Sequence, residues 1–128
     1  MIHSAQRILI VEDNKTEARL IRDLLERYGY ETLQTGDAFK AMKLALECLP
    51  DLILMDIQLP EISGLDVTRR LKGDERSQNI PIIAVTALAM GWHEREALDS
   101  GCDAYISKPF STFDFLHTVG SFLPRFPN

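Results

Sequence analysis

The chain has 128 residues, a length typical of one compact domain with its own hydrophobic core. With 45% hydrophobic and 26% charged residues it has the composition of a globular protein, and no apolar run approaches the roughly 20 residues that span a membrane. The net charge is −5 and the basic residues are scattered, so direct binding of nucleic acid is not expected.

The first seven residues lack the basic stretch and apolar core of a secretory signal, which favours a cytoplasmic protein. Cys48 and Cys102 are far apart in the sequence and form no C-x-x-C pattern, and the three histidines are isolated. Two reduced cysteines and no zinc site are therefore expected.

Strand and helix signals alternate five times along the chain. Three of the strand signals are nearly unbroken apolar runs, which are typical of parallel strands buried on both faces. The pattern predicts one α/β domain, residues 1–128 with a core of about 7–123, built as a doubly wound parallel sheet. The predicted strands are about residues 7–11, 31–35, 51–56, 82–86 and 104–107, and the predicted helices are about residues 14–28, 38–49, 63–72, 89–100 and 112–123.

Two of the helices carry more specific expectations. Asn14 followed three residues later by Glu17 predicts a capping box at the start of the first helix. On the fourth helix, Ala97 and Leu98 are expected to face the sheet. This orientation would put Trp92, the only tryptophan, on the exposed outer side of that helix.

Acidic side chains directly follow two of the predicted strands. Glu12 and Asp13 come after the first strand, and Asp56 comes after the third. Because the carboxyl ends of neighbouring parallel strands meet at one edge of the sheet, the three carboxylates are expected to lie together there. Thr86 and Lys108 end or follow the fourth and fifth strands and would join them at this edge.

Clustered carboxylates repel one another unless a cation compensates their charge. Mg²⁺ suits such a site because it prefers oxygen ligands, keeps several waters and is held by one or two carboxylates plus phosphate oxygens. Three carboxylates, Mg²⁺ and Lys108 would together be neutral, so a phosphoryl group could approach without net repulsion. Asp56 is the candidate nucleophile toward phosphorus, with Thr86 and Lys108 as partners of the phosphoryl oxygens.

Each of these residues alone has an ordinary structural explanation. A single Asp at a strand end often caps a turn, Thr86 is a usual strand residue, and Lys108 before Pro109 is a usual turn. Asn14 already serves as the helix cap, however, so the carboxylates are not needed for that purpose. Their arrival with Thr86 and Lys108 at successive strand ends favours a functional site.

Five motifs follow one another along the chain: Ile8 to Asn14, Asp51 to Asp56, Pro60 with Gly64, Thr86-Ala87, and Lys108-Pro109. Through these motifs the chain resembles the receiver domains of bacterial two-component response regulators over about residues 7–123. Within that family, residues 29–35 and 55–65 are most similar to stand-alone receivers of the DivK type.

The resemblance implies a flavodoxin-like sheet of five parallel strands in the order 2-1-3-4-5. It also implies that Asp56 takes a phosphoryl group from a histidine of a partner kinase or phosphotransfer protein. Mg²⁺ would be bound by Glu12, Asp13, Asp56 and the backbone carbonyl of Gln58. The protein would be a phospho-switched signalling module that catalyses only its own phosphorylation and slow dephosphorylation, not an enzyme with turnover.

The resemblance further implies a conformational switch. Thr86 would move to bond the phosphoryl group, Lys108 would pair with another of its oxygens, and Tyr105 would turn inward. The Lys108-Pro109 peptide bond would be cis. These changes would alter the surface made by the fourth helix, the fifth strand and the fifth helix, where a downstream protein would bind.

Trp92 and Phe113 are the candidate partner contacts on that surface, because exposed aromatic residues are enriched among interface hot spots. The expected partner at these residues is a kinase, a target protein or a second copy of the chain. The protein itself is expected to be a monomer or a weak homodimer. Leu88, two residues after Thr86, stands where some family members carry a polar group. An apolar side chain there predicts a long-lived acyl phosphate, because it cannot orient an attacking water.

Two alternatives stay open, and a third, an electron carrier, is disfavoured. The chain could be a receiver excised from a hybrid histidine kinase or from a larger regulator. It could be a Mg²⁺-dependent aspartyl-phosphate phosphatase, although that class needs a second Asp two residues after the nucleophile, where this chain has Gln58. A flavodoxin-like electron carrier would need a Ser/Thr/Gly-rich phosphate loop after the first strand, where this chain has Glu12 to Lys15.

Overall fold

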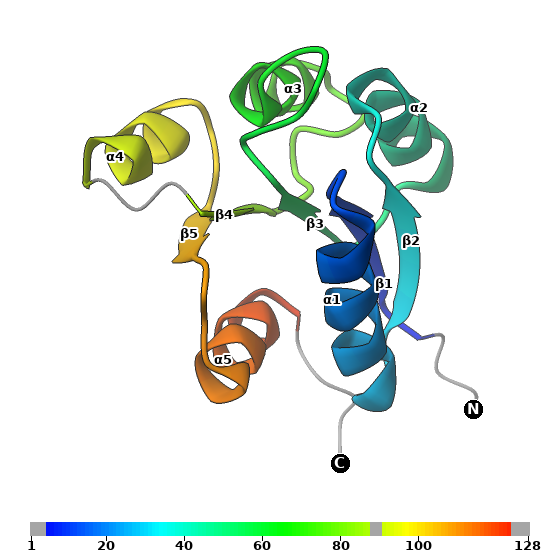
Figure 1. Cartoon of the computed structure of the whole chain (residues 1–128). Coiled ribbons are helices and arrows are strands. Elements are labelled where there is room, and N and C mark those ends of the chain that lie inside the picture. Colours follow the sequence, from blue (N-terminus) through cyan, green and yellow to red (C-terminus); the bar gives the residue numbers. More distant parts are fainter. Residues whose placement is uncertain (1–4, 88–90, 124–128) are drawn as a thin grey trace.

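The structure, a computed structural model, describes residues 5–87 and 91–123 apart from the side chain of Trp92. Five strands and five helices alternate in this part of the chain (Figure 1), and none of these helices is long and apolar enough to cross a membrane. The strands are β1 (Arg7–Val11), β2 (Glu31–Thr35), β3 (Leu52–Met55), β4 (Ile82–Thr86) and β5 (Ala104–Ser107). The helices are α1 (Lys15–Arg27), α2 (Ala38–Cys48), α3 (Gly64–Lys72), α4 (Gly91–Asp99) and α5 (Thr112–Phe122).

The strands form one parallel sheet in the order β2-β1-β3-β4-β5, which confirms the predicted fold class. Helices α1 and α5 cover one face of the sheet, and α2, α3 and α4 cover the other (Figure 1). The strand order reverses at β1, which pairs with β2 on one side and with β3 on the other. The connection after β1 leads to α1 on one face of the sheet, and the connection after β3 leads to α3 on the other face. In a doubly wound sheet a crevice forms beyond the carboxyl ends of two such neighbouring strands. The acidic residues that follow β1 and β3 therefore lie at that crevice.

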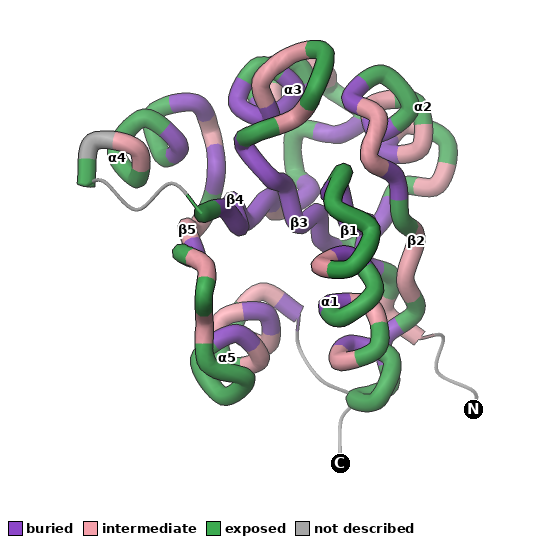
Figure 2. Tube along the Cα trace, viewed as in Figure 1, coloured by how far each residue is buried: buried purple, intermediate pink, exposed green. Residues whose placement is uncertain are grey.

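The unbroken apolar runs are explained by a core on each face of the sheet. Successive residues of a strand point to opposite faces. In β1, Leu9 and Val11 join the core under α2, α3 and α4, whereas Ile8 and Ile10 join the core under α1 and α5. β3 and β4 divide their side chains in the same way, and Figure 2 shows the central strands buried along their length.

The elements end within about two residues of their predicted limits. Leu49, in the left-handed conformation with φ of 45°, ends α2 just before Pro50. At the start of α1, Asn14 accepts a hydrogen bond from the backbone N–H of Glu17 at 3.0 Å, as predicted. The second half of the capping box is wrong, because the backbone N–H of Asn14 donates to Glu12 Oε2 at 3.1 Å and not to Glu17.

The expectation for α4 is wrong for one of its two residues. Ala97 is fully buried, but Leu98 is 44% exposed. Adjacent positions of a helix are about 100° apart, so the two residues cannot both point directly at the sheet. α4 lies against β5 with the small side chain of Ala97 inward, which leaves Leu98 on the outside. The expectation that Trp92 is exposed concerns a side chain outside the described residues.

Candidate functional site

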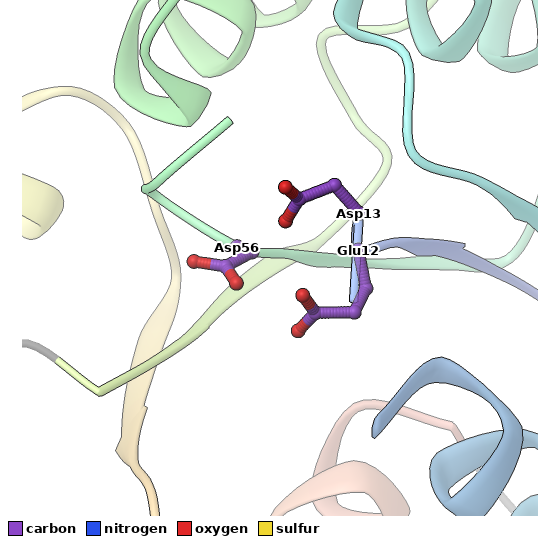
Figure 3. A group of neighbouring side chains, drawn as sticks. All are labelled: Glu12, Asp13 and Asp56. Atoms are coloured by element: carbon purple, nitrogen blue, oxygen red, sulfur yellow. The ribbon is translucent and has the colours of Figure 1, made fainter. Parts of the chain in front are cut away.

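Three carboxylates meet at the carboxyl end of the sheet. The hydrogen-bond ladder continues one residue beyond the central strands, because Glu12 N–H donates to Thr35 O at 2.9 Å and Asp56 N–H donates to Val11 O at 3.0 Å. These bonds hold the backbones of Glu12 and Asp56 in the strand direction. Figure 3 shows their side chains and that of Asp13 converging, and each offers an oxygen within 4.8 Å of the others.

The three carboxylates differ in their exposure to water. Glu12 is 4% exposed and Asp56 is 7% exposed, whereas Asp13 is exposed at the rim. A hollow opens over them and is lined by Glu12, Asp13, Asn14, Glu17, Asp56, Gln58, Ala87 and Lys108. Asp56 can therefore be reached from outside, although most of its surface is covered.

The ammonium group of Lys108 compensates part of this negative charge. It donates to Glu12 Oε1 at 2.5 Å, to Glu17 Oε2 at 3.2 Å and to Asp56 Oδ2 at 3.3 Å. Its backbone N–H donates to Thr86 O at 2.9 Å, and the peptide bond to Pro109 is cis, as expected. The end of β4 thus fixes the backbone from which Lys108 reaches across to the carboxylates.

Glu12 and Lys108 have shifted pKa values. Burial raises the pKa of Glu12 from 4.5 to about 7, and the charge of Asp56 adds to this effect, although the hydrogen bond from Lys108 opposes it. Burial alone would lower the pKa of Lys108, but its hydrogen bond to Glu12 and the charges of Asp56 and Glu12 raise it. Lys108 is therefore held as a cation, and Glu12 ionises near neutral pH.

The loop after β3 holds Asp56 in one orientation. The backbone N–H of Gln58 donates to Asp56 Oδ1 at 2.9 Å, and that of Gly64 donates to Ile57 O at 2.8 Å. A Cβ at Gly64 would lie 2.1 Å from the backbone oxygen of Asp56, so only glycine allows α3 to begin this close to the site. Gly64 is thus a structural support for the loop that carries Asp56.

The remaining expected site residues lie at the ends of β4 and β5. Thr86 is fully buried, and Ala87 lines the hollow beside Asp56. Tyr105 is half-buried against the core under α4, and its hydroxyl oxygen is covered without a hydrogen bond in the described part of the chain. Burial raises the pKa of Tyr105. Leu88 lies outside the described residues.

Phe113 is 76% exposed on α5, and its ring is stacked on that of His117 with 6.0 Å between centroids. It lines a shallow hollow with Tyr28, at the end of α1, and with Leu116. At this hollow Phe113 lies beside the end of α1. The helix that carries Trp92, α4, covers the opposite face of the sheet (Figure 1). A patch shared with Trp92 stays a prediction.

Glu17 was missed as a site residue by the sequence argument, which used it as a helix cap. It lies in the first turn of α1, and its carboxylate contacts Lys108. Its place in the first turn of the helix that follows Glu12 and Asp13 was the available signal, because the start of that helix lies at the carboxyl end of β1. With Glu17 the site holds four carboxylates and one lysine, which contacts Glu12, Glu17 and Asp56. This excess of negative charge favours a bound cation.

The exposed position of Asp13 gives a first prediction. Replacing Asp13 by Asn will raise the metal-free free energy of unfolding by about 0.5–1 kcal/mol, because one of several repelling carboxylates is removed. The same change will weaken binding of divalent metal. Urea unfolding in EDTA and metal titration measure the two effects, with Glu75→Gln, an exposed residue outside the site, as the control. An Asp13→Asn protein that is less stable than wild type without metal would contradict the clustered-carboxylate site.

Comparison with known proteins defines the class of protein to which the chain belongs. The model of the response regulator receiver domain matches residues 8–119. This covers most of the chain, and the chain belongs to that family.

Among individual proteins, the chain is similar to the polar-differentiation response regulator DivK of Brucella ovis. The two are 54% identical over 116 residues, which cover 91% of this chain and 94% of the relative. DivK of Brucella anthropi is 53% identical over the same length.

Solved receiver structures have the same fold. The receiver domain of a sensor histidine kinase from Pseudomonas aeruginosa, with magnesium coordinated in its active-site cleft, superposes with a TM-score of 0.87 at 31% identity. The match covers 95% of this chain and all of that one. The receiver domain of a signal transduction histidine kinase from Syntrophus aciditrophicus gives a TM-score of 0.86, also at 31% identity, with 97% and 96% of the two chains covered.

Proposed function

We propose that the protein is a phosphoacceptor receiver in which Asp56 takes a phosphoryl group from a phosphohistidine of a partner protein. The observation that carries the proposal is the position of Asp56. It is a largely buried carboxylate at the strand-order reversal, held by Gln58 N–H and Lys108, and open to a hollow. The matched family and the similarity to DivK support this function.

In the proposed reaction an oxygen of Asp56 attacks phosphorus and forms an acyl phosphate. The phosphorus–nitrogen bond of the donor breaks, and the imidazole nitrogen keeps the electron pair. Lys108 stabilises an equatorial oxygen of the phosphoryl group as charge develops. The hydroxyl of Thr86, at the end of β4 next to Ala87 in the hollow, would bond another oxygen after a small movement.

Glu12, Asp13 and Asp56 suit a divalent metal, because each offers a carboxylate oxygen within 4.8 Å of the others and hard cations prefer oxygen ligands. We propose that the metal is Mg²⁺, as in the Pseudomonas aeruginosa receiver, and that the backbone carbonyl of Gln58 is a further ligand. Bound Mg²⁺ would neutralise the carboxylates and draw charge from the phosphoryl oxygens. Water molecules would complete its octahedron.

The pKa of Glu12 makes metal binding depend on pH. Below pH 7 most metal-free protein carries a proton on Glu12, which must leave when the metal binds. We expect the apparent Mg²⁺ affinity to rise about tenfold from pH 6 to pH 8 and then to level off. Because the folded pKa lies above the unfolded value of 4.5, metal-free stability will fall as pH rises from about 5 to about 7.

Metal titrations at four pH values, followed by calorimetry, measure this dependence. The Glu12→Gln variant is the matched control, because it binds metal more weakly but has no proton to lose at this position. An affinity for the wild type that is flat between pH 6 and pH 8 would contradict the role given to Glu12.

Thr86 tests the switch half of the proposal. Thr86→Ala will accept a phosphoryl group at a rate within about threefold of wild type but will not transmit the change, because the hydroxyl that follows the phosphoryl group is missing. Labelling by acetyl phosphate and amide exchange of α4, β5 and Tyr105 before and after labelling measure the two properties. Wild-type exchange changes in the labelled Thr86→Ala protein would remove Thr86 from the switch.

The expected partners are a histidine kinase or histidine phosphotransfer protein and a downstream target in the cytoplasm. A second hollow, lined by apolar atoms of Leu20, Pro109 and Phe110, adjoins the acidic one and shares Glu17 and Lys108 with it. Because the donor histidine must reach Asp56, its protein would contact this apolar rim.

A labelling experiment separates a receiver from a phosphatase. Wild-type protein is incubated with acetyl phosphate in Mg²⁺ or in EDTA, and both protein-bound phosphoryl groups and released phosphate are counted. The receiver proposal predicts one phosphoryl group per chain, only with Mg²⁺, and phosphate release limited by slow decay of that label. Rapid multiple turnover without accumulation of label would favour the phosphatase alternative.

A further inference from the structure

Glu17 occupies one of the three donors of the lysine on which phosphoryl acceptance depends. An ammonium group has three N–H donors and no more. In this structure all three of Lys108 are directed at carboxylates, namely Glu12, Glu17 and Asp56. A phosphoryl oxygen that needs Lys108 must therefore displace one of these partners or share its donor.

The three partners differ in how easily they can be displaced. The side chains of Glu12 and Asp56 are 4% and 8% exposed. If either lost its hydrogen bond from Lys108, water could hardly replace it, and a buried charge would be left without a partner. The side chain of Glu17 is 42% exposed and can be rehydrated when it leaves. Glu17 is also not required as a helix cap, because Glu12 accepts the hydrogen bond from Asn14 N–H.

We propose that Glu17 is a restraining residue that holds Lys108 in the unphosphorylated protein and competes with the incoming phosphoryl group for it. This inference rests on the proposed function and adds to it a residue that sets the rate of acceptance. Glu17 acts in two ways through one carboxylate. It retains a donor of Lys108, and it places a negative charge at the mouth of the hollow through which an anionic donor approaches.

Glu17 is a positioning residue and not a metal ligand. The described residues whose oxygens converge within 4.8 Å are Glu12, Asp13 and Asp56, and Glu17 is not among them. Its contact is with Lys108. Removing the Glu17 charge should therefore change the rate of phosphoryl acceptance and leave metal binding almost unchanged.

The test compares three proteins in labelling by acetyl phosphate at saturating Mg²⁺. Glu17→Gln keeps the shape of the side chain and removes the charge. Glu17→Asp keeps the charge but shortens the reach by one methylene, so that contact with Lys108 at 3.2 Å is lost. Glu47→Gln, on the exposed side of α2 near its C-terminal end, is the control for net charge.

Glu17→Gln should label about fivefold faster than wild type, the factor expected when one half-exposed ion pair no longer has to be broken. Glu17→Asp should label faster than wild type but more slowly than Glu17→Gln, because it loses the contact with Lys108 and keeps the negative charge, and Glu47→Gln should label at the wild-type rate. The advantage of Glu17→Gln should shrink in high salt, because salt screens the pair that wild type must break. The Mg²⁺ affinity of Glu17→Gln should stay within about twofold of wild type.

Three results would overturn the proposal. Labelling of Glu17→Gln at or below the wild-type rate would show that Glu17 does not compete for Lys108. A wild-type rate for Glu17→Asp would show that the charge, not the contact, matters. A large loss of Mg²⁺ affinity in Glu17→Gln would make Glu17 a metal ligand. Failure of the proposed function is distinguishable, because wild-type protein would then not be labelled at all.

Discussion

Replacing Asp56 by Asn will abolish labelling of the protein by acetyl phosphate in Mg²⁺. The amide oxygen of Asn is a poor nucleophile toward phosphorus, and the change also removes one charge from the metal site. We expect the labelling rate to fall by about three orders of magnitude or more. Measurement of protein-bound phosphoryl over time gives the rate directly.

Loss of folding would not explain that result, and a control residue at the other end of β3 tests this point. Asp56 is 7% exposed among other carboxylates, so its neutral variant should be at least as stable as wild type without metal. Asp51 precedes β3 at the other edge of the sheet, is exposed, and accepts a hydrogen bond from Arg7 N–H at 2.8 Å. Asp51→Asn should label at the wild-type rate. Stable labelling of Asp56→Asn at another residue would contradict the assignment of the phosphoacceptor.

Replacing Lys108 by Met will lower the metal-free free energy of unfolding by about 2–4 kcal/mol at pH 8, because two buried carboxylates lose their cation. The hydrogen bond from Lys108 lowers the pKa of Glu12, so its loss raises that pKa above the wild-type value of about 7 and lets Glu12 take up a proton. The destabilisation should therefore be smaller at pH 6 than at pH 8. Saturating Mg²⁺ should restore part of it, since the metal supplies positive charge to the same oxygens.

Urea unfolding in EDTA and in Mg²⁺, at both pH values, measures these differences. Lys40→Met is the matched control, because Lys40 is exposed on α2 and its variant should change the stability by less than about 0.5 kcal/mol. If Lys108→Met were as stable as wild type at pH 8 without metal, the contacts of Lys108 with Glu12 and Asp56 would not hold in solution.

The convergence of Glu12, Asp13 and Asp56 could be predicted because it depends on chain order and strand direction alone. Each residue follows a strand whose apolar run marks it as central, and parallel strands bring such positions to one edge. The same reasoning placed Lys108 and Thr86. None of these steps required knowledge of side-chain conformation.

The features that were missed depend on which of several close partners a side chain chooses. Glu17 could complete a capping box or reach Lys108, and its spacing from Asn14 favoured the first. The outcome was decided by Glu12, whose carboxylate reaches the N–H of Asn14 first. Leu98 illustrates the same limit, because α4 meets the sheet through Ala97, and a short helix with one small inward residue gives a weak amphipathic signal.

The most direct test of the central claim is to locate the phosphoryl group on the chain. Protein labelled with acetyl phosphate in Mg²⁺ is reduced with borohydride, which converts an acyl phosphate into an alcohol, and its peptides are sequenced by mass spectrometry. The proposed function predicts a single modified position, Asp56, in the peptide that contains β3. Modification at Glu12, Asp13 or a histidine, or no modification at all, would contradict it.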